Sequence, residues 1–98
     1  MSDASLNVNA DGLAELQGAL DFHSVPLLWP QLKALIERGE ALQVSLAQVS
    51  STNSAALALL TEAASLARSR SVELQFSDLP QDLLDIAELS NAAQLIGG

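Results

Sequence analysis

Three residues of this sequence carry the side chains of a catalytic triad, namely Asp21, His23 and Ser54. In hydrolases of that kind the histidine takes a proton from the serine hydroxyl, and the aspartate orients the histidine. The chemistry also needs the base within hydrogen-bond reach of the serine and an oxyanion site, and the spacing of these residues indicates neither. A single histidine in a loop is usually just solvated, so we expect no triad here.

Other reactive patterns are missing as well. The sequence has no cysteine and one histidine, so it lacks the His/Cys/Asp spacing of zinc sites. It has no glycine-rich phosphate loop and no close pair of carboxylates in an apolar setting. We therefore expect a protein that is not an enzyme and that uses neither a metal nor a cofactor.

The densest group of small polar side chains is SSTNS at residues 50–54, which runs directly into the apolar AALALL of residues 55–60. Ser, Thr and Asn accept hydrogen bonds from the free N–H groups of a first helical turn, so Thr52 or Asn53 is expected to cap a helix that begins near Ser54. One residue is enough for a cap, and five polar residues stand here. We interpret the surplus as part of a surface that contacts a partner.

Composition limits what that partner is. A chain of 98 residues with 49% hydrophobic content fits one compact domain, and we expect a single domain over residues 1–98. Twelve acidic residues against four basic ones give a net charge of -8, which disfavours binding to nucleic acid or to anionic lipid. The sequence lacks an apolar run that could span a bilayer, and its first residues lack the features of a signal peptide. We expect a cytoplasmic protein without direct membrane insertion.

Hydrophobic periodicity predicts the elements that position these residues. The predicted strands are Ser5–Asn9, Leu13–Gln17, Ala41–Leu46 and Val72–Phe76, and the predicted helices are Ser24–Arg38, Ser54–Ser69 and Pro80–Ser90. Pro30 in the first helix predicts either a kink near Trp29 or a later start of the regular helix. Residues 91–98 are either a last edge strand or a frayed end.

The predicted order of elements is ββαβαβα. Strands that are separated by a helix join through right-handed crossovers and lie parallel, whereas the first hairpin adds an antiparallel strand. The sequence therefore predicts an α/β fold with a mixed sheet of four to five strands and about three helices. Functional loops in such sheets follow the carboxyl ends of strands, and we predict that residues 48–53 form one that leads to Ser54.

Several short motifs resemble the STAS domain family, which includes anti-sigma-factor antagonists and the cytoplasmic domains of sulfate transporters. They are GALD at 18–21, between the hairpin and the first helix, and NSAAL at 53–57, at the start of the next long helix. VPLLW at 25–29, LALL at 57–60 and LARS at 66–69 resemble the branch that supplies small subunits of bacterial phospholipid ABC transporters. The resemblance covers nearly the whole chain.

The resemblance implies one of two roles for Ser54. The corresponding serine is phosphorylated in sigma-factor switches, and it contacts a partner in the transporter branch. This chain has Asn53 where the family usually has Asp, and it has Ala55 and Ala56 where small glycines are common. No arginine lies close in sequence to pair with a phosphate, so we favour the transporter branch and keep the phosphorylated anti-sigma-factor antagonist as the alternative.

The transporter branch implies an accessory subunit that binds and stabilises or regulates the ATPase of an ABC phospholipid transporter, which maintains outer-membrane lipid asymmetry. Such a subunit sits at the inner membrane through the ATPase alone and meets the permease and lipid-binding subunits indirectly. The predicted partner-binding residues are Asp21, Trp29, Asn53, Ser54, Ala55 and Ala58. Asp21 has the more ordinary role of accepting hydrogen bonds from turn N–H groups, and Trp29 is either a core residue or an interface anchor.

Overall fold

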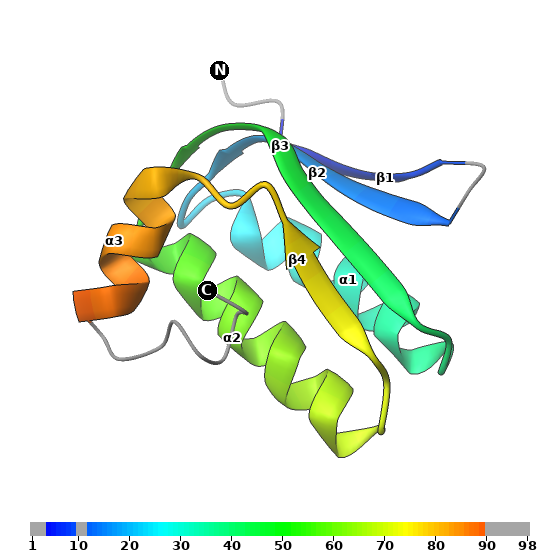
Figure 1. Cartoon of the computed structure of the whole chain (residues 1–98). Coiled ribbons are helices and arrows are strands. Elements are labelled where there is room, and N and C mark those ends of the chain that lie inside the picture. Colours follow the sequence, from blue (N-terminus) through cyan, green and yellow to red (C-terminus); the bar gives the residue numbers. More distant parts are fainter. Residues whose placement is uncertain (1–3, 10–11, 90–98) are drawn as a thin grey trace.

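The computed structural model describes residues 4–9 and 12–89 of the chain (Figure 1). Its strands are β1 (Ser5–Val8), β2 (Leu13–Leu20), β3 (Leu42–Thr52) and β4 (Leu74–Ser77), and its helices are α1 (Val25–Glu37), α2 (Ser54–Ser69) and α3 (Gln81–Leu89). The predicted order ββαβαβα is confirmed. Residues 10–11 of the hairpin connection and the predicted strand or frayed end at 91–98 lie outside the described residues.

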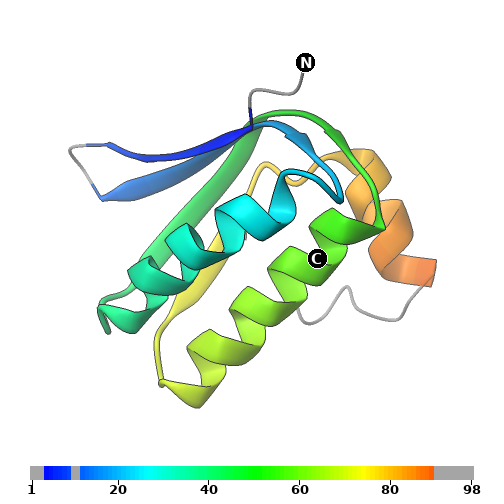
Figure 2. The ribbon, with the colours of Figure 1, turned by 180° about the vertical axis from the view of Figure 1, so that it is seen from behind.

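The four strands form one sheet in the order β1-β2-β3-β4. β1 pairs with β2 in antiparallel fashion, while β2–β3 and β3–β4 are parallel pairs, as the hairpin and the two crossovers require. Helices α1 and α2 lie side by side and cover the same face of the sheet (Figure 2). The mixed sheet and the fold class predicted from the sequence are therefore both confirmed.

The hydrophobic core fills the space between that face of the sheet and the two helices. Leu16, Leu20 and Val44 enter it from β2 and β3, and α1 and α2 supply further aliphatic side chains. Those that are almost fully buried are Leu28, Leu32, Ile36, Leu59 and Leu60. Leu28, Leu32 and Ile36 recur every four residues in α1, and Leu59 and Leu60 lie between the buried Ala56 and Ala63 in α2, which is the helical pattern from which the two helices were predicted.

Two strands are longer than the sequence indicates. β2 extends to Leu20 and β3 to Thr52, so the prediction of a loop over residues 48–53 is wrong. Parallel pairing decides the end of β3, because Gly18, Ala19 and Leu20 of β2 lie opposite Val49, Ser51 and Thr52. Strands pair through backbone N–H and C=O groups, whatever the polarity of their side chains. A stretch of polar residues can therefore form a strand.

Helix α1 starts at Val25 and continues to Glu37 with Pro30 inside it, so the prediction of a later start is wrong. Proline suits the first turn, where Pro26 stands, because N–H groups there have no helical acceptor. Pro30 lacks the N–H that would bond the carbonyl of Pro26 one turn earlier. The helix loses one hydrogen bond near its beginning, and the burial of Leu28, Leu32 and Ile36 holds the rest in place.

Gly18 explains the first residue of the GALD motif. Its φ of 84° lies in the left-handed region, and the register between β2 and β3 shifts directly after it. A side chain makes this backbone conformation unfavourable, whereas glycine adopts it freely. The shift lets β2 end with Leu20 fully buried and Asp21 at the start of the connection to α1.

We expect Gly18→Ala to lower the free energy of unfolding by about 1–2 kcal/mol, because a Cβ atom in the left-handed conformation comes too close to a backbone carbonyl oxygen. Ser50→Ala, at an exposed position of β3, serves as the control and should change stability by less than about 0.5 kcal/mol. Urea denaturation followed by circular dichroism measures both. Equal stability of Gly18→Ala and the wild type would show that this position does not require glycine.

Candidate partner-binding surface

The central strands β2 and β3 end next to each other. Leu20 and Thr52 form their last pair, so Asp21 and Asn53, the next residue of each chain segment, leave the sheet at the same edge. Helices α1 and α2 begin at this edge and run away from it in the same general direction (Figure 2). Two of the predicted partner-binding residues are thus brought together by strand pairing.

Asp21 organises the start of α1. Its Oδ1 accepts hydrogen bonds from the backbone N–H groups of His23 and Ser24, each at 2.9 Å. The Ser24 hydroxyl accepts from the N–H of Asp21 at 2.9 Å and donates to the carbonyl of Ala19 at 2.8 Å. This reciprocal exchange has the pattern of a capping box in the turn before α1, whose N-cap is Ser24, and it confirms that Asp21 accepts hydrogen bonds from N–H groups of the turn.

The same hydrogen bonds set the charge of Asp21. Bonds from the N–H groups of Ser24 and His23 stabilise the ionised carboxylate and lower its pKa below the ordinary value, against a smaller opposing effect of burial. Asp21 is therefore a fixed negative charge at neutral pH. Because an unfolded aspartate titrates near pH ~3.9, the stabilisation from this charge is complete above that pH and is lost as the pH falls through the lower pKa of the folded state.

We expect Asp21→Asn to lower the melting temperature at pH 7, because the amide keeps one acceptor but loses the charge. The difference should shrink as the pH falls below about 4 and should vanish only below the lowered pKa of the folded protein, where the wild-type carboxylate is protonated. Melting curves over a pH series measure the difference. A difference between the two melting temperatures that stays constant down to pH ~2 would contradict this role of the carboxylate.

Thr52, Asn53 and Ser54, at the start of α2, differ in their hydrogen bonding. The Asn53 Oδ1 caps the helix by accepting from the N–H of Ala55 at 2.8 Å, which confirms one of the two predicted caps. The Thr52 hydroxyl donates to Oδ2 of Asp82 in the first turn of α3 at 3.0 Å. Ser54 is exposed, and its hydroxyl makes no hydrogen bond within the described part of the chain.

Of the predicted contact residues on α2, Ser54 and Ala58 are exposed and Ala55 is buried. Ser54 and Ala58 are exposed one helical turn apart, and Ser65 is exposed two turns further on. Ala55 is only 6% exposed, so its methyl group lies inside the molecule and the structure does not support a direct contact there. The first two turns of the outer side of α2 therefore present small side chains that let a partner approach closely, and the exposed Glu62 follows one turn after Ala58.

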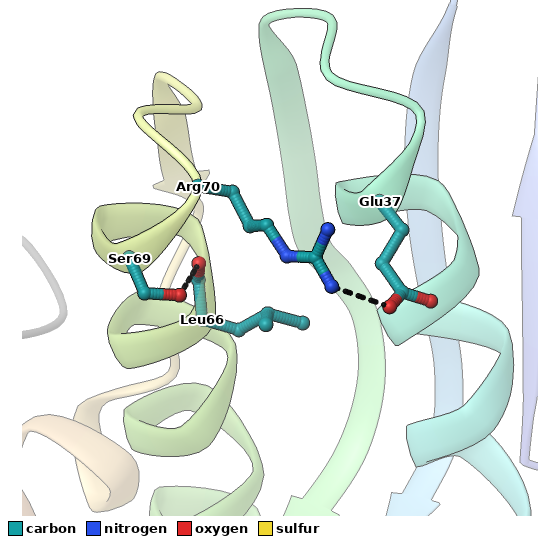
Figure 3. A network of polar contacts seen from close by, with 4 residues as sticks. All are labelled: Glu37, Leu66, Ser69 and Arg70. Atoms are coloured by element: carbon teal, nitrogen blue, oxygen red, sulfur yellow. Dashed lines mark hydrogen bonds and ion pairs between the residues drawn. The ribbon is translucent and has the colours of Figure 1, made fainter.

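Trp29 is half-buried and packs against the hydrophobic core. Trp29, Lys33 and Glu37 follow one another at intervals of four residues and lie along one side of α1. Glu37 forms an ion pair of 3.0 Å with Arg70 at the end of α2, so this side of α1 faces α2 (Figure 3). The indole thus combines contact with the core and partial exposure.

Basic and acidic residues lie in different places relative to the starts of α1 and α2. The four basic residues are Lys33, Arg38, Arg68 and Arg70, and all lie beyond the first turns of α1 and α2. At a rise of 1.5 Å per residue, Arg68 is about 21 Å along α2 from Ser54. The carboxylates of Asp21 and Asp82 stand instead at the sheet edge where α2 begins. Ser54 thus has acidic neighbours and no basic residue in the first turns of either helix.

Within the described ranges, Ser54 and His23 share no hydrogen bond, and no cluster of His, Cys, Asp or Glu is suited to hold a metal ion. A hollow of about 570 Å³ lies away from Ser54, over the strand face that α1 and α2 leave open, with Gln43, Ser45 and Gln75 in its lining. Among the helices of the described part of the chain, none is long and apolar enough to cross a membrane.

Two exposed apolar residues, Phe22 and Leu27, were not predicted from the sequence. Phe22, which follows Asp21, is 67% exposed, and Leu27, in the first turn of α1, is 71% exposed. Leu27 falls outside the spacing of the buried residues Leu28, Leu32 and Ile36, and this position on the helix was the signal available in the sequence.

The family model described as the Mlab STAS domain matches residues 6–97. The chain belongs to this MlaB-like STAS family. The solved structure of the anti-sigma factor antagonist SpoIIAA in its unphosphorylated form is similar over 95% of this chain and 84% of that one, with a TM-score of 0.70 and 11% sequence identity. At that identity the likeness supports the STAS fold alone. No curated protein sequence matches the chain.

Proposed function

We propose that this STAS domain is a non-enzymatic, cytoplasmic subunit that binds the ATPase of a phospholipid ABC transporter and stabilises or regulates it. It would be peripheral to the inner membrane through that ATPase, with the permease and the lipid-binding subunits as indirect partners. The MlaB-like family supports the type of partner. The contact surface proposed for it consists of Asp21, Trp29, Asn53, Ser54 and Ala58.

One observation carries the choice of Ser54 as the centre of this surface. Its side chain is exposed, and its hydroxyl is left without a hydrogen bond in the described residues while Thr52 and Asn53 on its N-terminal side are both engaged. A hydroxyl at a helix start, next to the small side chain of Ala58, can pair with a polar group of a closely packed partner. That arrangement suits a permanent neutral contact.

The SpoIIAA-like fold raises a second candidate, an anti-sigma-factor antagonist that is switched by phosphorylation of Ser54. The helix N-terminus would favour a phosphate, but Asp21 and Asp82 would repel it. Arg68 is the nearest cation along α2, at about 21 Å, too far for an ion pair. The charge distribution therefore favours the transporter subunit.

The proposal is tested by copurification with the ATPase of a phospholipid ABC transporter from the same host. Ser54→Arg should abolish the complex, because a long cation cannot fit a closely packed contact, while Ser54→Ala should weaken it by less than about 1 kcal/mol. Gln75→Arg adds the same side chain at an exposed position of β4 and should leave the complex intact. Retention of wild-type binding by a folded Ser54→Arg variant would place the interface elsewhere.

The two candidate functions differ further in the effect of Ser54→Asp. In the transporter subunit this change buries an unpaired charge at the interface and should be more harmful than Ser54→Ala. In the phosphorylation switch, alanine should lock the binding-competent form and aspartate should imitate the released form. Intact-mass analysis of the protein from its native host should find no phosphate, and a stoichiometric phosphate on Ser54 would establish the switch instead.

A further inference from the structure

The start of α1 exposes a group of apolar side chains that the proposed contact around Ser54 does not use. We call Phe22, Pro26, Leu27 and Pro30 the α1 patch, and all four are exposed. Only Val8, at the other edge of the sheet, joins Phe22 and Leu27 as an exposed large hydrophobic residue in the described part of the chain. Single exposed apolar residues are ordinary, whereas a contiguous group marks an interaction site.

Helical geometry makes the α1 patch contiguous. The N–H of Val25 donates to the carbonyl of Asp21 at 3.0 Å, so the chain already follows a helical turn before α1 begins. Phe22 therefore stands one turn before Pro26, and Pro30 stands one turn after it. Leu27 lies three residues before Pro30 and borders the same row. The four side chains form one stripe about two turns long.

The exposed side chains of Phe22 and Leu27 have no role in the core or in the start of α1. The buried side of α1 carries Leu28, Leu32 and Ile36, and the capping box of Asp21 fixes the start of the helix without Phe22 or Leu27. Proline rings lose almost no side-chain freedom when they are covered, so a stripe that contains two of them is inexpensive to bury. These properties are those of a preformed binding surface.

Charge indicates what covers the stripe. Asp21 stands at its first turn with a carboxylate held ionised, whereas Lys33 borders the far end of the stripe, three residues after Pro30, and Arg38 follows the end of α1. With a net charge of -8, two copies of this chain would repel each other. A partner with an apolar recess bordered by Lys or Arg is complementary both to the stripe and to the acidic edge of the sheet.

We propose that the α1 patch is the main anchor of this protein on its partner, with Phe22 and Leu27 inserted into an apolar recess of the ATPase and basic residues of the ATPase facing Asp21. This inference rests on the proposed function and adds to it. The contact around Ser54 defines how closely α2 approaches the partner, and the α1 patch supplies most of the affinity.

The test measures binding of the full chain to the purified ATPase by surface plasmon resonance. Phe22→Ser and Leu27→Ser should each raise Kd by about tenfold or more, as for buried apolar anchors, and mainly through faster dissociation. Val8→Ser removes a comparable exposed apolar side chain from the opposite edge and should change Kd less than about twofold. All three variants should melt within a few degrees of the wild type, because the three residues are exposed.

Salt and self-association complete the test. Association with the ATPase should slow as the salt concentration rises, and sedimentation should show the free chain as a monomer. Wild-type affinity of the folded Phe22→Ser/Leu27→Ser double variant would overturn the inference and leave the proposed function standing. A dimer that the double variant dissociates would assign the α1 patch to a second copy. Absence of binding by the wild type would overturn both proposals.

Discussion

Parallel pairing of β2 with β3 is the constraint on which the rest of the structure depends. It places Leu20 opposite Thr52, so the residues that start α1 and α2 leave the sheet at one edge. Right-handed crossovers then bring both helices to the same face, where their aliphatic sides cover Leu16, Leu20 and Val44. Without this register, Asp21 and Asn53 would belong to unrelated parts of the surface.

The surface at this edge combines small polar side chains from the start of α2 with exposed apolar side chains from the start of α1. Helix α2 contributes the small polar start at Ser54 and the small side chain of Ala58, which permit close approach of another backbone. Helix α1 contributes the exposed rings and aliphatic chain of Phe22, Pro26 and Leu27. Because the basic residues lie toward the other ends of the helices, this edge is also acidic, which favours recognition of a basic protein surface over phosphate chemistry.

The sequence predicted features with local causes and missed those with distant ones. Helix α2 was predicted at its observed bounds because its cap and apolar stripe lie within it. The end of β3 was mistaken for a loop, since its pairing partner Gly18 is 31 positions away along the chain and leaves no mark on the polar residues themselves. Helical periodicity identified Leu28 and Leu32 as buried, but exposure of Phe22 and Leu27 depends on what the tertiary structure leaves uncovered.

Amide hydrogen exchange of the free chain and of its complex with the ATPase tests the central claim most directly, because it locates the covered surface without mutation. The account predicts slower exchange in the complex over residues 22–30 and 54–60, at the starts of α1 and α2, with β4 unchanged. Protection confined to β4 and the open face of the sheet, with the two helix starts exchanging as in the free chain, would contradict it.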